Sequence, residues 1–160
     1  MIRRFHHAGF TVSNVDAAER FFTKNFGMRR IGGGVYDLPY MRRQVGFPNA
    51  ILKVAVMAFP EGKSWSQVDR VELIEYLRPK GRPVGTDTNR PGGAHLCFLV
   101  DDLHSIYKKL RRRGVRFKSS PNHVTFGINK GAWAVYFNGP GGIALELFQP
   151  PPKTKQRKKS

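Results

Sequence analysis

The sequence predicts an α+β protein built of two tandem βαβββ modules whose strands form a curved mixed sheet, shaped as a cup. One observation is a repeated short apolar strand opened by a histidine, His7-x-x-Phe-x-Val and His95-x-x-Phe-x-Val, with the same spacing in both copies. Another is that each copy is followed by a segment with helical spacing and then by three short apolar runs. The last run of each half contains a glutamate, Glu72 or Glu146.

The first module is expected to occupy residues 1–79. After its opening strand, Ser13 and Asp16 resemble the capping box that starts a helix, and Gly27 is a natural helix stop. Apolar residues between these signals recur at helical spacing. Three strands are then predicted, at 28–35, 50–58 and 69–76.

The second module is expected to occupy residues 93–149. Its helix can be capped by Asp101 or Asp102 and ends at Gly114. The segment 80–92 is rich in proline, glycine and polar residues and is predicted to be a linker. The remaining predictions are strands at 115–118, 133–137 and 143–148, and a basic, disordered tail at 150–160.

Length and composition favour a folded cytoplasmic protein. The chain has 160 residues, 40% of them hydrophobic, which suits one compact domain with a core. No apolar run approaches the roughly 18 residues of a membrane span, and the N-terminus lacks the apolar centre of a signal peptide. Cys97 is the only cysteine, so no intramolecular disulfide can form and a reducing compartment is expected.

The net charge of +17 raises the question of nucleic-acid binding. Five of the basic residues lie in the tail, and the others are dispersed except for KKLRRR at 108–113, on a predicted helix where solvated charge is the common explanation. No helix-turn-helix, RNP or zinc-finger pattern accompanies the charge. We therefore expect the basic surface to steer an anionic small-molecule substrate, and we keep nucleic-acid binding through the tail as an alternative.

Strand alternation brings the four repeated polar residues to one side. Successive side chains of a strand point to opposite faces. The apolar residues of each opening strand take the face under the predicted helix, which leaves His7 and His95 on the opposite face. Glu72 and Glu146 each stand between two apolar neighbours and therefore also point away from the helix side. All four side chains are thus predicted to converge on the concave side of the sheet.

A divalent metal ion explains this set better than four separate roles. A lone strand histidine is usually a hydrogen-bonded core or edge residue, and a carboxylate between two apolar residues is costly to desolvate without a partner. Two glutamates at matching positions, each with a matching histidine, indicate a cation. The set suits one zinc, nickel, cobalt, manganese or iron ion with water completing the coordination, held by His7, Glu72, His95 and Glu146.

Five other residues of these types are assigned differently. Parity places His6 on the helix side, and Glu75 is expected to be a surface or edge charge. His104 lies among polar residues of a helix and is expected to be solvated. His123, in a loop, is either an acid or base near the site or an ordinary exposed residue, and Cys97 either lines the pocket or packs as a small hydrophobe.

With these assignments the chain resembles the vicinal oxygen chelate superfamily, which comprises glyoxalase I, bleomycin-resistance proteins and extradiol dioxygenases. The resemblance rests on HHAGFTVSNVDAAERFFTKNFGM, VELIEYL, GGAHLCFLVDDLHSIYKKLRRRGVRF and AVYFNGPGGIALELFQP, which span almost the whole chain before its tail. It implies paired βαβββ modules forming a cup around a metal. The chain departs from the family pattern at NGPGG, where an acidic turn is frequent, and it has no secure glutathione or coenzyme A signature.

The resemblance also implies a class of reaction. Ring-cleaving dioxygenases of this superfamily use two histidines and one carboxylate around ferrous iron, and bleomycin-binding members use no metal. A His, Glu, His, Glu set resembles the glyoxalase I and methylmalonyl-CoA epimerase branches, where the ion stabilises an enediolate and a carboxylate, here Glu146 or else Glu72, moves the proton. The function expected is thus a metal-dependent lyase or isomerase. The alternatives are a ferrous dioxygenase and a metal-free ligand-binding protein.

Loops at corresponding positions of the two modules, 38–48 and 119–130, are candidates for substrate contact. Because relatives build their cups within one chain or across a dimer, we expect a homodimer. The side chains that could bind an anionic substrate, each otherwise an ordinary exposed loop residue, are Tyr40, Arg42, Arg43, Arg90, His123 and Lys130.

Overall fold

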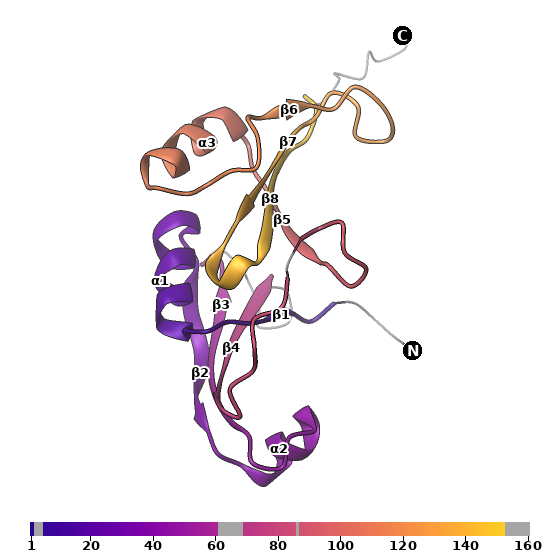
Figure 1. Cartoon of the computed structure of the whole chain (residues 1–160). Helices are drawn as coiled ribbons and strands as arrows, with labels where there is room; N and C mark the ends of the chain where they lie inside the picture. Colours follow the sequence, from indigo (N-terminus) through magenta and orange to yellow (C-terminus); the bar gives the residue numbers. More distant parts are fainter. Residues whose placement is uncertain (2–4, 61–68, 86, 153–160) are drawn as a thin grey trace. The chain divides into compact units, whose positions relative to one another are not determined.

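The structure is a computed structural model that describes residues 1, 5–60, 69–85 and 87–152 (Figure 1). The chain divides into two compact units. Unit 1 comprises Met1–Gly85 with Pro140–Gly142, and unit 2 comprises Thr86–Gly139 with Ile143–Ser160. Each unit holds a four-stranded mixed sheet and at least one helix, so the predicted α+β class and two-module organisation are confirmed. The predicted disordered tail lies, from residue 153 onward, outside the described residues.

The sheet of unit 1 has the strand order β1-β4-β3-β2, with β1 parallel to β4 and the other neighbours antiparallel. α1 connects β1 to β2, the strand at the opposite edge of the sheet. The two antiparallel pairings make β2 parallel to β1, and such a parallel connection requires a crossover, here the helix. The elements of this unit are β1 Ala8–Thr11, α1 Val15–Phe26, β2 Arg29–Tyr36, α2 Pro39–Val45, β3 Ile51–Ala58 and β4 Arg70–Arg78.

The sheet of unit 2 repeats this order as β5-β8-β7-β6, again with one parallel pair, β5 with β8. Its helix α3 corresponds to α1 of the first unit. The short helix η1, Pro140–Gly142, precedes β8 in the chain but belongs to unit 1. The elements of unit 2 are β5 His95–Leu99, α3 Leu103–Arg112, β6 Asn122–His123, β7 Trp133–Asn138 and β8 Ala144–Gln149.

Each sheet has one face covered by its long helix. In unit 1, Val15, Ala18 and Phe22 of α1 are fully buried against the sheet face that includes Leu73 and Met57, also fully buried. In unit 2, α3 buries Leu103 and Leu110, over the face of β7 and β8 that carries the buried residues Val135, Phe137, Leu145 and Leu147. Alternation leaves the opposite face of each sheet for the polar residues of the repeat.

The start of α1 differs from the prediction. Its N-cap is Asn14, whose side-chain oxygen accepts a hydrogen bond from the Ala17 amide at 2.8 Å. Ser13 and Asp16 therefore do not form the predicted capping box. Asp16 instead pairs with Lys53 of β3 at 2.6 Å, which lowers the pKa of its carboxyl group. In α3 the N-cap is Asp102, one of the two residues predicted, and it accepts from the Ser105 amide at 3.0 Å.

Two further segments were predicted incorrectly. The loop expected at 38–48 contains α2, which has a proline in its first turn and Gly46 at its C-cap with φ +75°. The strand expected at 115–118 is reduced to one bridge, Phe117 with Phe137, because Gly114 turns the chain sharply at φ +86°. The fourth strand of unit 2 is β6.

Each unit has a helix cap of the same kind, which the sequence analysis did not predict. Glu75 of β4 accepts a hydrogen bond from the Val15 amide at 2.9 Å, at the first residue of α1. Gln149 of β8 accepts from the Leu103 amide at 2.8 Å, at the first residue of α3. Both residues follow the glutamate of the repeat by three positions. The strand that carries the glutamate therefore also satisfies an otherwise unpaired amide at the helix start.

We expect Gln149→Ala to destabilise the fold by about 1 kcal/mol, because the Leu103 amide loses its acceptor in a partly buried position. Urea denaturation monitored by circular dichroism measures the change. Thr23→Ala, at an exposed position of α1, is the control and should not lower the unfolding midpoint, because alanine has the higher helix propensity. Equal midpoints for Gln149→Ala and the parent protein would show that solvent replaces this cap without cost.

Candidate functional site

In unit 1 the parallel strands β1 and β4 bring His7 to Glu72. Gly9 lies opposite Glu72 in the ladder, and the His7 ring, although His7 precedes β1, lies on the same side, 3.9 Å from the point where a Cβ atom of Gly9 would be. The distance between His7 Nε2 and Glu72 Oε2 is 3.4 Å. The side chains are 38% and 26% exposed, so the pair is accessible from solvent and partly shielded.

Unit 2 repeats this arrangement with the same register. Cys97 lies opposite Glu146 in the parallel pair of β5 and β8, and His95 is two residues before Cys97. His95 Nε2 lies 3.2 Å from Glu146 Oε2, and the two side chains are 41% and 13% exposed. The repeat of the sequence is therefore also a repeat of geometry, with one histidine–glutamate pair on the open face of each sheet.

The donor atoms of each pair are spaced as ligands of one ion would be. Two donors at about 2.0–2.2 Å from a metal and about 90–110° apart lie about 3.0–3.5 Å from each other. The separations of 3.4 and 3.2 Å fall in this range, and each pair supplies one imidazole nitrogen and one carboxylate oxygen. Within the described residues, no group of three or more histidine, cysteine, aspartate or glutamate side chains is arranged so that it could hold a metal ion. Each unit thus offers half of the predicted ligand set.

The two pairs differ in the residues beside the glutamate. Glu72 has Gly9 and Val56 as its neighbours across the sheet, whereas Glu146 has Cys97 and Tyr136. The second pair therefore has two more polar groups at hand than the first. This asymmetry depends on the pairing of β7 with β8, which local sequence patterns do not specify.

Tyr136 and Cys97 remain protonated at neutral pH in this setting. The Tyr136 hydroxyl lies 3.1 Å from His95 Nε2. Burial, and then the negative charge of Glu146, raises the pKa of Tyr136 to about 12. The same two causes raise the pKa of the Cys97 thiol to about 12. Tyr136 is therefore a hydrogen-bond donor, and Cys97 is a neutral thiol rather than a nucleophilic thiolate.

The face of unit 1 that carries Glu72 has an apolar floor. Leu52, Val54 and Val56 of β3 lie opposite Tyr76, Ile74 and Glu72 of β4, and so share the face of Glu72. Met41 and Val45 of α2 pack against this floor, and the Phe47 ring contacts Tyr76 at 5.7 Å between centroids. The segment 38–48 therefore lies over the same sheet face as the histidine–glutamate pair.

Of the predicted substrate residues in unit 1, Tyr40, Arg42 and Arg43 belong to α2. The Tyr40 side chain is exposed, and Arg42 forms an ion pair with Asp37. Arg43 is exposed. These three residues are carried by the helix that covers the apolar floor.

The predicted substrate residues of unit 2 are not gathered at Glu146. His123 of β6 lies opposite Trp133, in contact with its ring at 4.9 Å, on the face that α3 covers. Arg90 is exposed and pairs with Asp87 at 3.2 Å. Lys130 is exposed in the turn before β7.

Three other residues that the sequence raised lie as follows. His6 precedes β1, and its ring nitrogen is 2.9 Å from a guanidinium nitrogen of Arg70. Arg70 shares the face of Glu72, so the parity argument that placed His6 under the helix is wrong. Both histidines precede β1, where strand alternation does not hold, and His6 Nδ1 lies 2.8 Å from His7 Nδ1. Glu75 is the helix cap described above. His104 contacts Trp133, ring to ring, at 4.6 Å.

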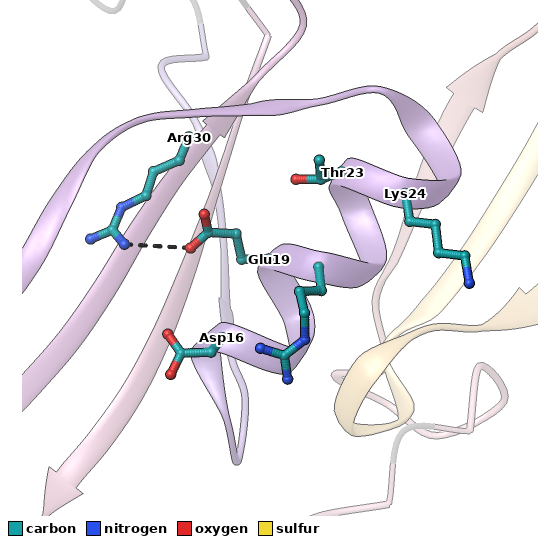
Figure 2. Close-up of a pocket in the computed structure, with 6 residues that line it drawn as sticks. Asp16, Glu19, Thr23, Lys24 and Arg30 are labelled. Atoms are coloured by element: carbon teal, nitrogen blue, oxygen red, sulfur yellow. Dashed lines mark hydrogen bonds and ion pairs between the residues drawn. The ribbon is translucent and has the colours of Figure 1, made fainter.

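A separate groove of about 660 Å³ lies on the outer face of α1, away from the open face of the sheet (Figure 2). Its lining contains both signs of charge, the acidic Asp16 and Glu19 and the basic Arg20 and Lys24. Arg30 pairs with Glu19 at 3.4 Å, as Figure 2 shows. The histidine–glutamate pairs contribute nothing to it. We assign it to the solvated surface of the helix.

Comparison with known proteins gives a consistent result. The family model described as "Glyoxalase/Bleomycin resistance protein/Dioxygenase superfamily" matches residues 4–147. A curated relative named 2-epi-5-epi-valiolone epimerase, from Actinomyces sp., is 31% identical over 150 residues, which are 91% of this chain and 79% of the relative.

Within the described residues, no helix has the length and apolar character needed to cross a membrane.

Solved structures agree on the fold. A glyoxalase family protein from Bacillus cereus superposes with a TM-score of 0.79 at 21% identity, over 95% of this chain and 97% of the other. Glyoxalase I from Zea mays superposes with a TM-score of 0.61 at 20% identity, over 93% of this chain and 45% of the other. At these identities the likeness supports the architecture and leaves the chemistry to the residues of the site.

Proposed function

This chain belongs to the glyoxalase/bleomycin resistance protein/dioxygenase superfamily, and from that premise we propose that it is a divalent-metal-dependent epimerase acting on a small oxygenated ketone. The observation that carries the proposal is the pair of matched half-sets, His7 with Glu72 and His95 with Glu146. The named epimerase at 31% identity supports this reaction over the lyase reaction that the sequence left open.

We propose that the two half-sets bind one ion together, within one chain or with a second copy of the chain. Two imidazoles and two carboxylates suit zinc, nickel, cobalt, manganese or iron, and they balance a charge of +2. Such an ion, when bound, polarises the substrate carbonyl as a Lewis acid and makes the proton on the adjacent carbon more acidic.

The proton itself is moved by the carboxylates of this chain. Epimerisation next to a carbonyl requires removal of a proton from one face of the carbon and its return on the other face. Glu72 and Glu146 provide two carboxylate bases for these two tasks. Of the two, Glu146 is less exposed, with 13% of its side chain accessible against 26% for Glu72, which favours it as the first base.

We assign Tyr136 the role of orienting the substrate. Its neutral hydroxyl is a hydrogen-bond donor beside Glu146, whereas the apolar Val56 occupies the equivalent position beside Glu72. Burial, and then the negative charge of Glu146, raises the pKa of this phenol to about 12, which favours the protonated form at neutral pH. It can therefore donate to a substrate oxygen while Glu146 acts on the adjacent proton.

Tyr136→Phe is expected to lower kcat by about 10- to 100-fold, with the fold and bound metal unchanged, because only the hydroxyl is removed. Val56→Thr, which adds a hydroxyl beside Glu72, is the matched control and should have a smaller effect. An unchanged kcat for Tyr136→Phe contradicts the assignment.

The reaction is tested directly with 2-epi-5-epi-valiolone, the ketone named for the relative, in deuterium oxide. We expect inversion of one centre with incorporation of one deuterium at that carbon, seen by proton NMR and mass spectrometry. An oxygen electrode should record no consumption. Chelation should abolish turnover, and one of the five metals listed above should restore it.

Other outcomes would replace the proposal. Oxygen uptake with iron would indicate a dioxygenase, in which Glu72 would not bind the metal. Stoichiometric binding without deuterium exchange, unaffected by chelation, would indicate a metal-free ligand-binding protein. If a different ketone exchanges its proton for deuterium, the proposed reaction class stands and the proposed substrate is replaced.

A further inference from the structure

The outer face of α3 and the segment after it form an unbalanced basic surface. Residues 103–118 contain seven lysines and arginines and no aspartate or glutamate. Leu103 and Leu110 are fully buried beneath the helix, which puts the cations on its outward side. Six of them are exposed and, in the described part of the chain, pair with no carboxylate: Lys108, Lys109, Arg111, Arg112, Arg116 and Lys118. We call these six residues the α3 basic surface.

The needs of the helix explain only part of this charge. Cations in the last turn interact favourably with the helix dipole, and Lys109, Arg111 and Arg112 are placed to do so. Arg116 and Lys118 lie beyond the helix and gain nothing from it. Like charges three or four residues apart, such as Lys108 and Arg112, cost about 0.2–0.5 kcal/mol per pair. The accumulation of positive charge on α3 therefore lowers the stability of the helix.

The equivalent helix of unit 1 shows that the fold does not require this pattern. The outer face of α1 carries both acidic residues, Asp16 and Glu19, and basic residues, Arg20 and Lys24. Figure 2 shows Asp16, Glu19 and Lys24 on this face. Asp16 and Glu19 form ion pairs with Lys53 and Arg30 respectively. One member of the repeat thus has an ordinary solvated face, and the other has a face of a single sign.

The basic surface also contains a groove with an aromatic floor. A groove of about 570 Å³ lies between Arg111 and Arg116, with the rings of Tyr107 and Phe117 packed edge to face at 4.6 Å within it. The Arg111 guanidinium carbon lies 5.7 Å from the centre of the Tyr107 ring. A second groove of about 400 Å³ shares Tyr107 and Arg111 and continues to Lys108 and Arg112. Both lie on the outer side of unit 2, opposite to the face of Glu146.

We propose that the α3 basic surface binds the phosphate backbone of a single-stranded nucleic acid. Guanidinium groups bind phosphate through two parallel hydrogen bonds, and cations spaced along two connected grooves suit a repeating polyanion better than a single phosphate. A positive groove with aromatic rings is the arrangement that single strands require. An anionic membrane is disfavoured, because no large hydrophobic residue of 103–118 is exposed to enter it.

The test is a fluorescence-anisotropy titration of the full chain against a labelled mixed-sequence single strand of about 20 nucleotides, at several salt concentrations from about 50 to 200 mM. The test variant carries Arg111→Gln, Arg112→Gln and Arg116→Gln. The control carries Arg20→Gln, Lys24→Gln and Arg29→Gln, which remove the same charge from α1 and β2. Thermal unfolding of both variants checks the fold, and a chain lacking residues 153–160 separates the contribution of the tail.

We expect the parent protein to bind with steep salt dependence and the test variant to bind at least about 10-fold more weakly. Its slope of log affinity against log salt should fall by about 2, since each lost phosphate contact on a single strand removes about 0.7. The control should change affinity by less than about threefold, and the shortened chain should keep the difference between the two variants. The test variant should lose affinity for the single strand without losing the proposed epimerase activity or bound metal.

Three outcomes would overturn the proposal. If the test and control variants lose affinity for the single strand equally, net charge explains the binding and the α3 basic surface does not. If the chain that lacks only residues 153–160 no longer binds the single strand, the tail is the binding segment. Binding of phosphatidylserine vesicles with the same dependence on Arg111, Arg112 and Arg116 would make the partner a membrane.

Discussion

Glu146→Gln is expected to reduce the turnover number of the proposed epimerase reaction by about 10³-fold, the range that removal of a positioned acid–base group produces. Glu72→Gln should have a comparable effect, because inversion needs proton removal and proton return. The two losses should not add in the double variant, since the two carboxylates act in one reaction. Both substitutions preserve size, and both glutamates are only partly buried, so the fold should be retained.

Deuterium exchange separates the two carboxylates. Glu72→Gln retains Glu146, the proposed first base, and should incorporate deuterium into the substrate without inverting it. Glu146→Gln should neither incorporate deuterium nor invert the substrate. Glu75→Gln is the matched control: it lies on β4 near Glu72, faces α1, and a glutamine already performs its capping role in unit 2 as Gln149. Its activity should equal that of the parent protein. Full inversion by either Glu72→Gln or Glu146→Gln would remove that residue from the mechanism.

Gly33→Ala is expected to destabilise unit 1 by about 3 kcal/mol or more. Gly33 lies in β2 with φ +108°, which L side chains rarely adopt. A Cβ atom there would lie 2.1 Å from the Val54 carbonyl oxygen, a backbone atom that no side-chain rotation can move away. The substitution must therefore displace β3, which carries part of the apolar floor beside Glu72.

The adjacent residue provides the control. A Cβ added to Gly32 meets nothing within 4 Å, so Gly32→Ala should change the free energy of unfolding by less than about 1 kcal/mol. Urea denaturation of the two variants measures the difference. We also expect Gly33→Ala to lower metal affinity through the displaced strand. A fully stable Gly33→Ala protein would mean that β2 and β3 separate more easily than the ladder indicates.

The sequence predicted the module repeat and the relation of each histidine to its glutamate, because both depend on periodicity. Alternation within a strand is local, and repetition in a second copy made the matching positions visible. His7 and Glu72 are far apart in the chain, yet the same spacing at His95 and Glu146 indicated a shared register. The structure adds the ladder itself, with each glutamate opposite the second residue after its histidine.

Features that depend on contacts between distant segments were not predictable in this way. Tyr136 reaches Glu146 through the pairing of β7 with β8, and His123 is turned to the helix face by its pairing with Trp133. Glu75 resembled a surface charge because its acceptor role depends on the start of α1. The seven residues of α2 are too few for a helical period to emerge, although Pro39 and Gly46 were signals at its ends.

The central claim is that the two histidine–glutamate pairs hold one metal ion together, and the metal content of the purified protein tests it most directly. Elemental analysis of protein prepared without added metal should give one ion per chain, whether the set is completed within a chain or by a second copy. Glu72→Ala and Glu146→Ala should each lose that ion, because neither remaining set of ligands suffices. Full metal retention in both variants, or two ions per chain in the parent protein, would contradict the shared site.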